Sequence, residues 1–329
     1  MPTQIGRFTN LGLAIEDDEA PGTGVAPQIY LARQELTLNI NPVVLPDDAS
    51  YGRREKAIGK IVADNRYEIV ISGRLTELLA GYLMLGAMGK LTSSTAKDAP
   101  NTVVYDHLFD IEQGSVLPTF SLEVYGQIDK RYTGCVLSTL ELNYQPDDTV
   151  LYTATFMGTG EEATTGTYAY EAPQFYLTKL TEVKVAADVA SLAAADPICP
   201  NTMTLTINNN VLEYRGVGCK NHYGQSFEIK GSTELRLEDL TYKTMIDGAT
   251  TLAMSVTVTG AAELAGVGVT AKPAVAIVMP QITLETWSSR HDNDGIEMQT
   301  LGFDSDYDMA TPSAAKVTVT SLDTTYTHA

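Results

Sequence analysis

The sequence predicts a mainly β fold built of two tandem β-sandwich or open-barrel domains, each with one short helix packed on it. Three observations support this prediction. Several segments alternate apolar with polar residues, several segments recur in the same order in the second half, and each half holds one leucine-rich stretch that ends in glycine. A period of two indicates half-buried strands, and a recurring order of segments indicates a repeated unit.

The strand prediction rests on short runs of β-forming residues. The runs LTLNI, MTLTI, SVTVT and KVTVT occupy residues 36–40, 203–207, 255–259 and 316–320. Clusters rich in Asn, Asp and Gly, such as 145–148 and 291–295, follow or separate such runs and are typical of turns. The alternation therefore predicts antiparallel strands joined by tight connections.

The repeat is visible as matched segments. APQIYLAR at 26–33 recurs as APQFYLTK at 172–179, and LTLNINPVVL at 36–45 recurs as MTLTINNNVL at 203–212. Further matches in the same order are YEI at 67–69 with FEI at 227–229, LPTFSLE at 117–123 with MPQITLE at 279–285, and GCVLSTL from Gly134 with GIEMQTL from Gly295. These matches predict an N-terminal arm (1–25), a first copy (26–171) and a second copy (172–329) with an insertion at about 180–202.

Each copy is expected to carry one helix after its matched YEI or FEI strand. Leucines recur at helical spacing in both places, and a glycine follows each stretch, as is common where helices end. We expect the helices at about Leu75–Gly86 and Leu237–Asp247.

Composition excludes several classes of protein. The 329 residues carry 41 Asp plus Glu against 22 Lys plus Arg, a net charge of −19, which disfavours binding to a phosphate backbone. Cys135, Cys199 and Cys219 form no C-x-x-C pair, so neither a disulfide framework nor a zinc site is indicated. No apolar stretch is long enough to span a bilayer, and the N-terminus lacks the apolar region of a signal peptide.

The sequence offers no catalytic, metal or cofactor site. His107, His222, His291 and His328 are widely spaced, without a metal-ligand pattern. The HDNDG segment lacks the carboxylates that a calcium loop needs at its first and last positions, and GYLMLGAMGKLT lacks the spacing of a phosphate-binding loop. We therefore expect a protein that is not an enzyme and binds no cofactor.

The chain resembles the tail tube (major tail) proteins of long-tailed bacteriophages. The resemblance rests on the YEI strand, the leucine-rich helix that ends in glycine, LPTFSLE, the strand opened by Gly134 and Cys135, and LYTATFMG at 151–158. LTLNINPVVLPDDASYGRREK at 36–56 is similar too. A surface adhesion or carbohydrate-binding β-sandwich is the alternative interpretation.

The resemblance implies a virion protein, made in the host bacterial cytoplasm, whose inner sheets join into stacked rings around a bore that delivers the genome. Members with two tube domains resemble trimers that imitate a six-fold ring, so we expect homotrimeric rings, with homohexamers as the alternative. Implied partners are further copies of the chain and the tape-measure, tail terminator and baseplate or tip proteins. Double-stranded DNA would pass without specific binding.

Two surfaces are expected to matter for assembly. The loop 46–66 is basic, and we predict that Arg53, Arg54, Lys56 and Lys60 contact acidic surface of the next ring. The acidic balance predicts a bore lined by carboxylates that repel passing phosphates. Alternation places Thr119, Ser121 and Glu123 on one face of a strand, which would be either the bore or the outer wall.

Overall fold

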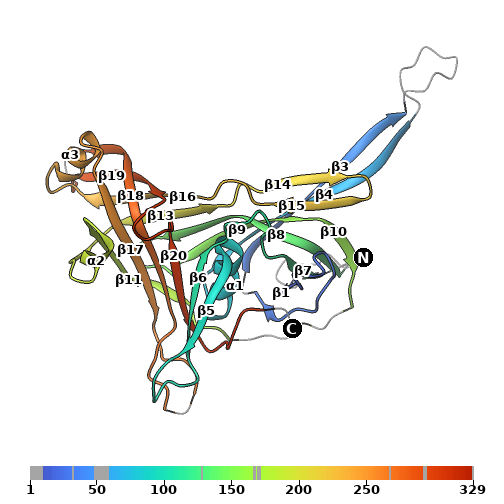
Figure 1. The fold of residues 1–329 in the computed structure, drawn as a ribbon, viewed down its shortest axis with the longest axis horizontal. Coiled ribbons are helices and arrows are strands. Elements are labelled where there is room, and N and C mark those ends of the chain that lie inside the picture. Colours follow the sequence, from blue (N-terminus) through green and yellow to red (C-terminus); the bar gives the residue numbers. More distant parts are fainter. Residues whose placement is uncertain are drawn as a thin grey trace.

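The fold is mainly β, as predicted (Figure 1). The structure is a computed structural model that describes residues 10–31, 33–47, 59–126, 129–165, 168, 172–266, 268–291 and 295–327. Nearly all the described strands join one antiparallel network, and β14 and β15 form a separate hairpin.

The first half of the chain contains one helix among its strands. Its elements are β1 (Asn10–Ile15), β2 (Ile29–Tyr30), β3 (Arg33–Asp47), β4 (Gly59–Arg74), α1 (Glu77–Met88), β5 (Gly89–Ala96), β6 (Tyr105–Ile111), β7 (Phe120–Tyr125), β8 (Lys130–Tyr144), β9 (Leu151–Gly158) and β10 (Gly160–Ala163).

The second half contains two short helices. Its elements are β11 (Tyr176–Ala186), α2 (Val189–Leu192), β12 (Pro197–Ile198), β13 (Thr202–Asn208), β14 (Leu212–Gly216), β15 (Cys219–Tyr223), β16 (Glu228–Arg236), α3 (Thr241–Asp247), β17 (Thr251–Gly260), β18 (Ala274–Arg290), β19 (Met298–Asp306) and β20 (Lys316–Ser321).

One continuous sheet runs through both halves, in the order β3–β4–β9–β8–β13–β16–β19–β18. We call it the long sheet. One of its faces is apolar and buried through most of its length, with Ile69, Leu140, Leu205, Ile229 and Phe303 all at most 2% exposed. Polar residues alternate with these, as expected for strands with one solvated face. The long sheet is therefore the element that unites the two halves.

A second set of pairs supplies the other side of the core. In the first half β1 pairs with β7, and β7 and β10 pair with the beginning of β8. In the second half β11 pairs with β17, and β17 and β20 pair with the beginning of β18. β8 and β18 thus take part in both layers, and each carries a register shift where it passes from one layer to the other.

The same order of pairs therefore occurs twice along the chain. β3–β4, β4–β9 and β8–β9 in the first half have the same connectivity as β13–β16, β16–β19 and β18–β19 in the second. By this order β7 corresponds to β17. The matched segments 117–123 and 279–285 instead lie at β7 and in β18, so they are not equivalent. Both segments belong to strands in which apolar and polar residues alternate, and this pattern recurs in strands that are not equivalent.

The helix predicted at Leu75–Gly86 is present as α1, two residues later. Thr76 is its N-cap, its hydroxyl accepting a hydrogen bond from the Leu79 amide at 3.3 Å, and Gly89 ends it at φ 86°. The prediction of Leu237–Asp247 began too early, because β16 continues to Arg236 and α3 starts at Thr241. One short helix was predicted for each half, but the second half also contains α2.

The structure also differs from the predicted boundaries. Residues 10–15, expected in an N-terminal arm, form the central strand β1, between β2 and β7, and Leu11 and Leu13 are buried. Residues 180–186, expected in an insertion, belong to β11 and pair with β17. The β5–β6 hairpin of the first half has no counterpart among the described elements of the second half, and β6 pairs with β20. Local sequence matches did not show these long-range pairs.

Candidate assembly surfaces

The two halves meet edge to edge within the long sheet. β8 pairs with β13 over six residues of each strand, from Thr139 to Tyr144 and from Met203 to Asn208. On the apolar face Leu142 lies opposite Leu205 and Leu140 opposite Ile207, and all four are buried. This internal joint shows that the edge of one half fits the edge of the other.

The two ends of the long sheet have no further strand partner among the described residues. Among the described residues, β3 pairs only with β4, and residues 286–290 of β18 pair only with β19. Within the described part of the chain, each of these strands therefore has one side along which no other strand pairs with it. Unpaired strand edges favour pairing with another chain unless the fold blocks them.

The open β3 edge is apolar as well as unpaired. Leu38 is 36% exposed and Ile40 is 45% exposed, although their neighbour Ile69 on β4 is buried. They lie on the face of the sheet that is the core elsewhere. This exposed edge therefore has the composition of an interface rather than of a solvated surface.

The outer parts of β3 and β4 project from the body as a long hairpin (Figure 1). We call residues 43–47 and 59–64 the projecting hairpin. Its apolar side chains are exposed, with Leu45 opposite Ile61 and Val44 opposite Val62. Lys60, one of the predicted contact residues, is exposed on it. Arg53, Arg54 and Lys56 lie outside the described residues.

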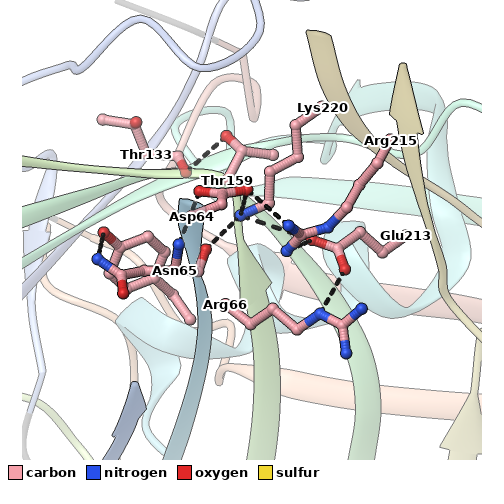
Figure 2. Close-up of polar contacts among 9 residues, drawn as sticks. Asp64, Asn65, Arg66, Thr133, Thr159, Glu213, Arg215 and Lys220 are labelled. Atoms are coloured by element: carbon pink, nitrogen blue, oxygen red, sulfur yellow. Dashed lines mark hydrogen bonds and ion pairs between the residues drawn. The ribbon is translucent and has the colours of Figure 1, made fainter. Parts of the chain in front are cut away.

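A second hairpin, β14–β15, lies beside the base of the projecting hairpin and is held there by ion pairs (Figure 2). Arg215 contacts Asp64 at 2.8 Å and Glu213 at 2.7 Å. Arg66 contacts Glu213 at 2.9 Å, and the Lys220 ammonium donates a hydrogen bond to the Asn65 carbonyl oxygen at 2.6 Å. A hairpin of the second half is thus fastened to a strand of the first half.

Glu213 is the centre of this network, since its side chain is only 11% exposed and three cations approach it. Burial by itself raises the pKa of Glu213. The hydrogen bond and charge of Arg215, with the charges of Lys220 and Arg66, outweigh burial and hold the pKa below its ordinary value. Burial also lowers the pKa of His222, which lies opposite Glu213 in this hairpin.

The other face of the long sheet is polar. Threonines and asparagines occupy much of it, including Thr139, Asn143, Thr153, Thr155, Thr204 and Thr206. Seven carboxylates share this face by alternation, namely Glu35, Glu68, Glu141, Glu228, Glu234, Asp304 and Asp306. They outnumber its five described bases, Arg66, Arg74, Lys230, Arg236 and Arg290. The face is therefore hydrophilic with an excess of negative charge.

The prediction for Thr119, Ser121 and Glu123 was wrong. β7 is buried along its whole length, with Ser121 and Glu123 each 1% exposed, so these two side chains line neither a bore nor an outer wall. Glu123 instead forms an ion pair with Arg131, and the Ser121 hydroxyl donates to Glu16 at 2.8 Å. β7 carries residues from two packed faces, which alternation alone cannot distinguish from one solvated face.

Neither a metal-binding cluster nor a membrane-spanning helix is found among the described residues. None of their His, Cys, Asp and Glu side chains gather in groups of three that could hold a metal ion. No helix in the described part of the chain combines the length and apolarity needed to cross a membrane. Sequence reasoning did not identify which strands form the edges of the long sheet, and it missed the Glu213 network, since both depend on strands that are distant in sequence.

We predict that Glu213→Gln loosens the β14–β15 hairpin. The change leaves Arg66, Arg215 and Lys220 without their shared anion, so the free energy of opening the hairpin should fall by about 1 to 3 kcal/mol. Hydrogen exchange of the β14–β15 amides should then be roughly 5- to 150-fold faster. Glu228→Gln, an exposed carboxylate outside the network, is the matched control and should leave that exchange unchanged.

The same variant tests the pH dependence of the network. Because the folded pKa of Glu213 is depressed, its stabilising effect is present above the ordinary pKa and is lost as pH falls through the folded pKa. Wild-type hairpin amides should therefore lose protection on acidification, and Glu213→Gln should lose less. Equal acid sensitivity of both proteins would contradict the role of Glu213.

A family model described as phage tail tube protein matches residues 6–321, nearly the whole chain. No curated protein matches the sequence. The family is structural and non-enzymatic, and its members are virion components. The chain belongs to the phage tail tube protein family.

Proposed function

We propose that this chain forms rings that stack into the hollow tail tube through which the phage genome is delivered. The observation that carries the proposal is the internal joint between β8 and β13, together with the two open edges left at the ends of the same sheet. Chains joined at these edges would continue the sheet, and a closed ring would leave no lateral edge exposed.

We further propose that the two halves are copies of one tube domain and that three chains make each ring. The repeated order of strand pairs supports the duplication and favours copies that begin at β1 and β11. The β5–β6 hairpin supports three-fold symmetry. It adds the pair β6–β20 to the internal joint, and the described second half has no equivalent hairpin between α3 and β17. Joints within chains and between chains would therefore differ.

The polar face of the long sheet is our candidate for the wall of the bore. Its carboxylates would repel passing phosphates, and its threonines and asparagines offer no cationic site at which DNA would stall. Identical rings that stack head to tail generate a filament without a built-in end. Tape-measure, terminator and baseplate or tip proteins would set the length and ends of the tube.

Stacking is proposed to involve the basic residues of the predicted loop 46–66, of which Lys60 lies on the projecting hairpin and Arg53, Arg54 and Lys56 lie outside the described residues. Purified wild-type protein should form hollow tubes with a bore wide enough for duplex DNA, as seen by electron microscopy. Arg53→Glu combined with Arg54→Glu should leave the monomer folded by circular dichroism but prevent tube growth, because acidic surface would then meet acidic loop. Normal tubes from the variant would contradict the contact, and a wild type that never forms tubes would contradict the function.

The charge of the bore is tested by reversing it. Glu68→Lys combined with Glu141→Lys should give tubes that retain short duplex DNA roughly tenfold or more tightly at low salt, with binding lost as salt rises. Glu19→Lys combined with Glu263→Lys makes the same change of charge at exposed turns away from the long sheet. If both double variants retain DNA equally, the polar face is not the wall of the bore.

A further inference from the structure

The strand register of the internal joint predicts the register of the joint between chains. We propose that residues 286–290 of β18 in one chain pair antiparallel with residues 37–41 of β3 in a second copy, with Ile40 opposite Trp287. This inference rests on the proposed ring. It adds the register, the residues in contact and the role of the single tryptophan.

The strand equivalent to β13 is β3. In the repeated order of strand pairs, β13 pairs with β16 in the second half as β3 pairs with β4 in the first half. Their sequences MTLTI and LTLNI match without a gap, so Leu38 corresponds to Leu205 and Ile40 to Ile207. β13 ends at Asn208, and the equivalent Asn41 precedes Pro42, which has no amide hydrogen for further pairing.

The strand equivalent to β8 is β18, through their partners β9 and β19. Tyr152, Ala154 and Phe156 are the buried residues of β9, and Gln299, Leu301 and Phe303 are those of β19. Aligning the two sets assigns each position of β8 a counterpart in β18. Leu142 lies opposite Tyr152 and Ser289 opposite Gln299, whereas Leu140 lies opposite Ala154 and Trp287 opposite Leu301.

Carrying the internal register over then fixes the joint between chains. The internal pairs Leu142–Leu205 and Leu140–Ile207 become Ser289–Leu38 and Trp287–Ile40. The half-buried Trp287 indole, held by a 3.1 Å hydrogen bond from its Nε1 to Gln299, would then pack on the exposed Ile40. The apolar edge of β3 would be covered by the same joint that satisfies its backbone.

The side chains on the polar face of the proposed joint also fit this register. The same register places Arg290 opposite Thr37, Ser288 opposite Asn39 and Thr286 opposite Asn41, with no like charges in direct opposition. A slip by one residue would turn Ile40 onto the polar face, and a slip by two would move it away from Trp287. The apolar and polar patterns of both strands therefore select one register.

Cysteine pairs across the joint test this register. In a Cys199→Ser, Cys219→Ser background, the in-register pairs are Leu38→Cys with Ser289→Cys and Asn39→Cys with Ser288→Cys. Adjacent antiparallel pairs alternate between wide and narrow spacing, so at least one of these should oxidise readily. The matched control, Ile40→Cys with Ser289→Cys, is slipped by two residues. Non-reducing denaturing electrophoresis of oxidised assemblies should show covalent dimers and closed trimers only for in-register pairs.

Trp287 provides an independent readout in the wild-type chain. Its fluorescence emission should shift to shorter wavelength as tubes form, and Ile40→Ser should reduce that shift. Tubes that assemble without in-register crosslinks, or with crosslinks only in the slipped pair, would overturn the register while leaving the ring intact. Wild-type protein that forms neither rings nor tubes would instead overturn the proposed function, and the joint with it.

Discussion

The structure depends on one constraint, which is that every β-strand edge must be paired or protected. The long sheet meets this constraint at its centre, where β8 of the first half pairs with β13 of the second. It does not meet it at its ends, where β3 and the end of β18 have no further partner among the described strands. The β3 edge, lined by Leu38 and Ile40, is typical of strand edges that pair with another chain.

The internal joint is reinforced in ways that a joint between chains would lack. β6 of the first half pairs with β20 of the second, and the C-terminal Tyr326 packs on α1. The Tyr326 ring lies so close to the α1 backbone that a Cβ added at Gly81 would be 1.9 Å from it. Only glycine fits at this position in the middle of the buried helix. α3 takes the place of α1 in the second half, and none of its residues is buried. Among the described residues, the two halves are thus held by one reinforced joint, and the two ends of the long sheet have no further strand partner.

The sequence was sufficient for the fold class, for α1 and for the strand run of β3. Each of these depends on local signals, namely alternation, leucine spacing and a terminal glycine. It was insufficient for the boundaries, because β1 and β11 are defined by pairing with β7 and β17 far along the chain. The buried Glu123 and the network around Glu213 were missed for the same reason. Acidic residues in a chain of net charge −19 carry no local mark of which are paired.

The central claim is that one chain supplies two equivalent segments to a closed ring, and the symmetry of the assembled tube tests it most directly. A cryo-electron microscopy reconstruction of tubes should show three chains in each ring, six similar sheet segments and the polar face of the long sheet turned toward the bore. A ring of six chains, or a long sheet whose ends stay unpaired in the tube, would contradict the account.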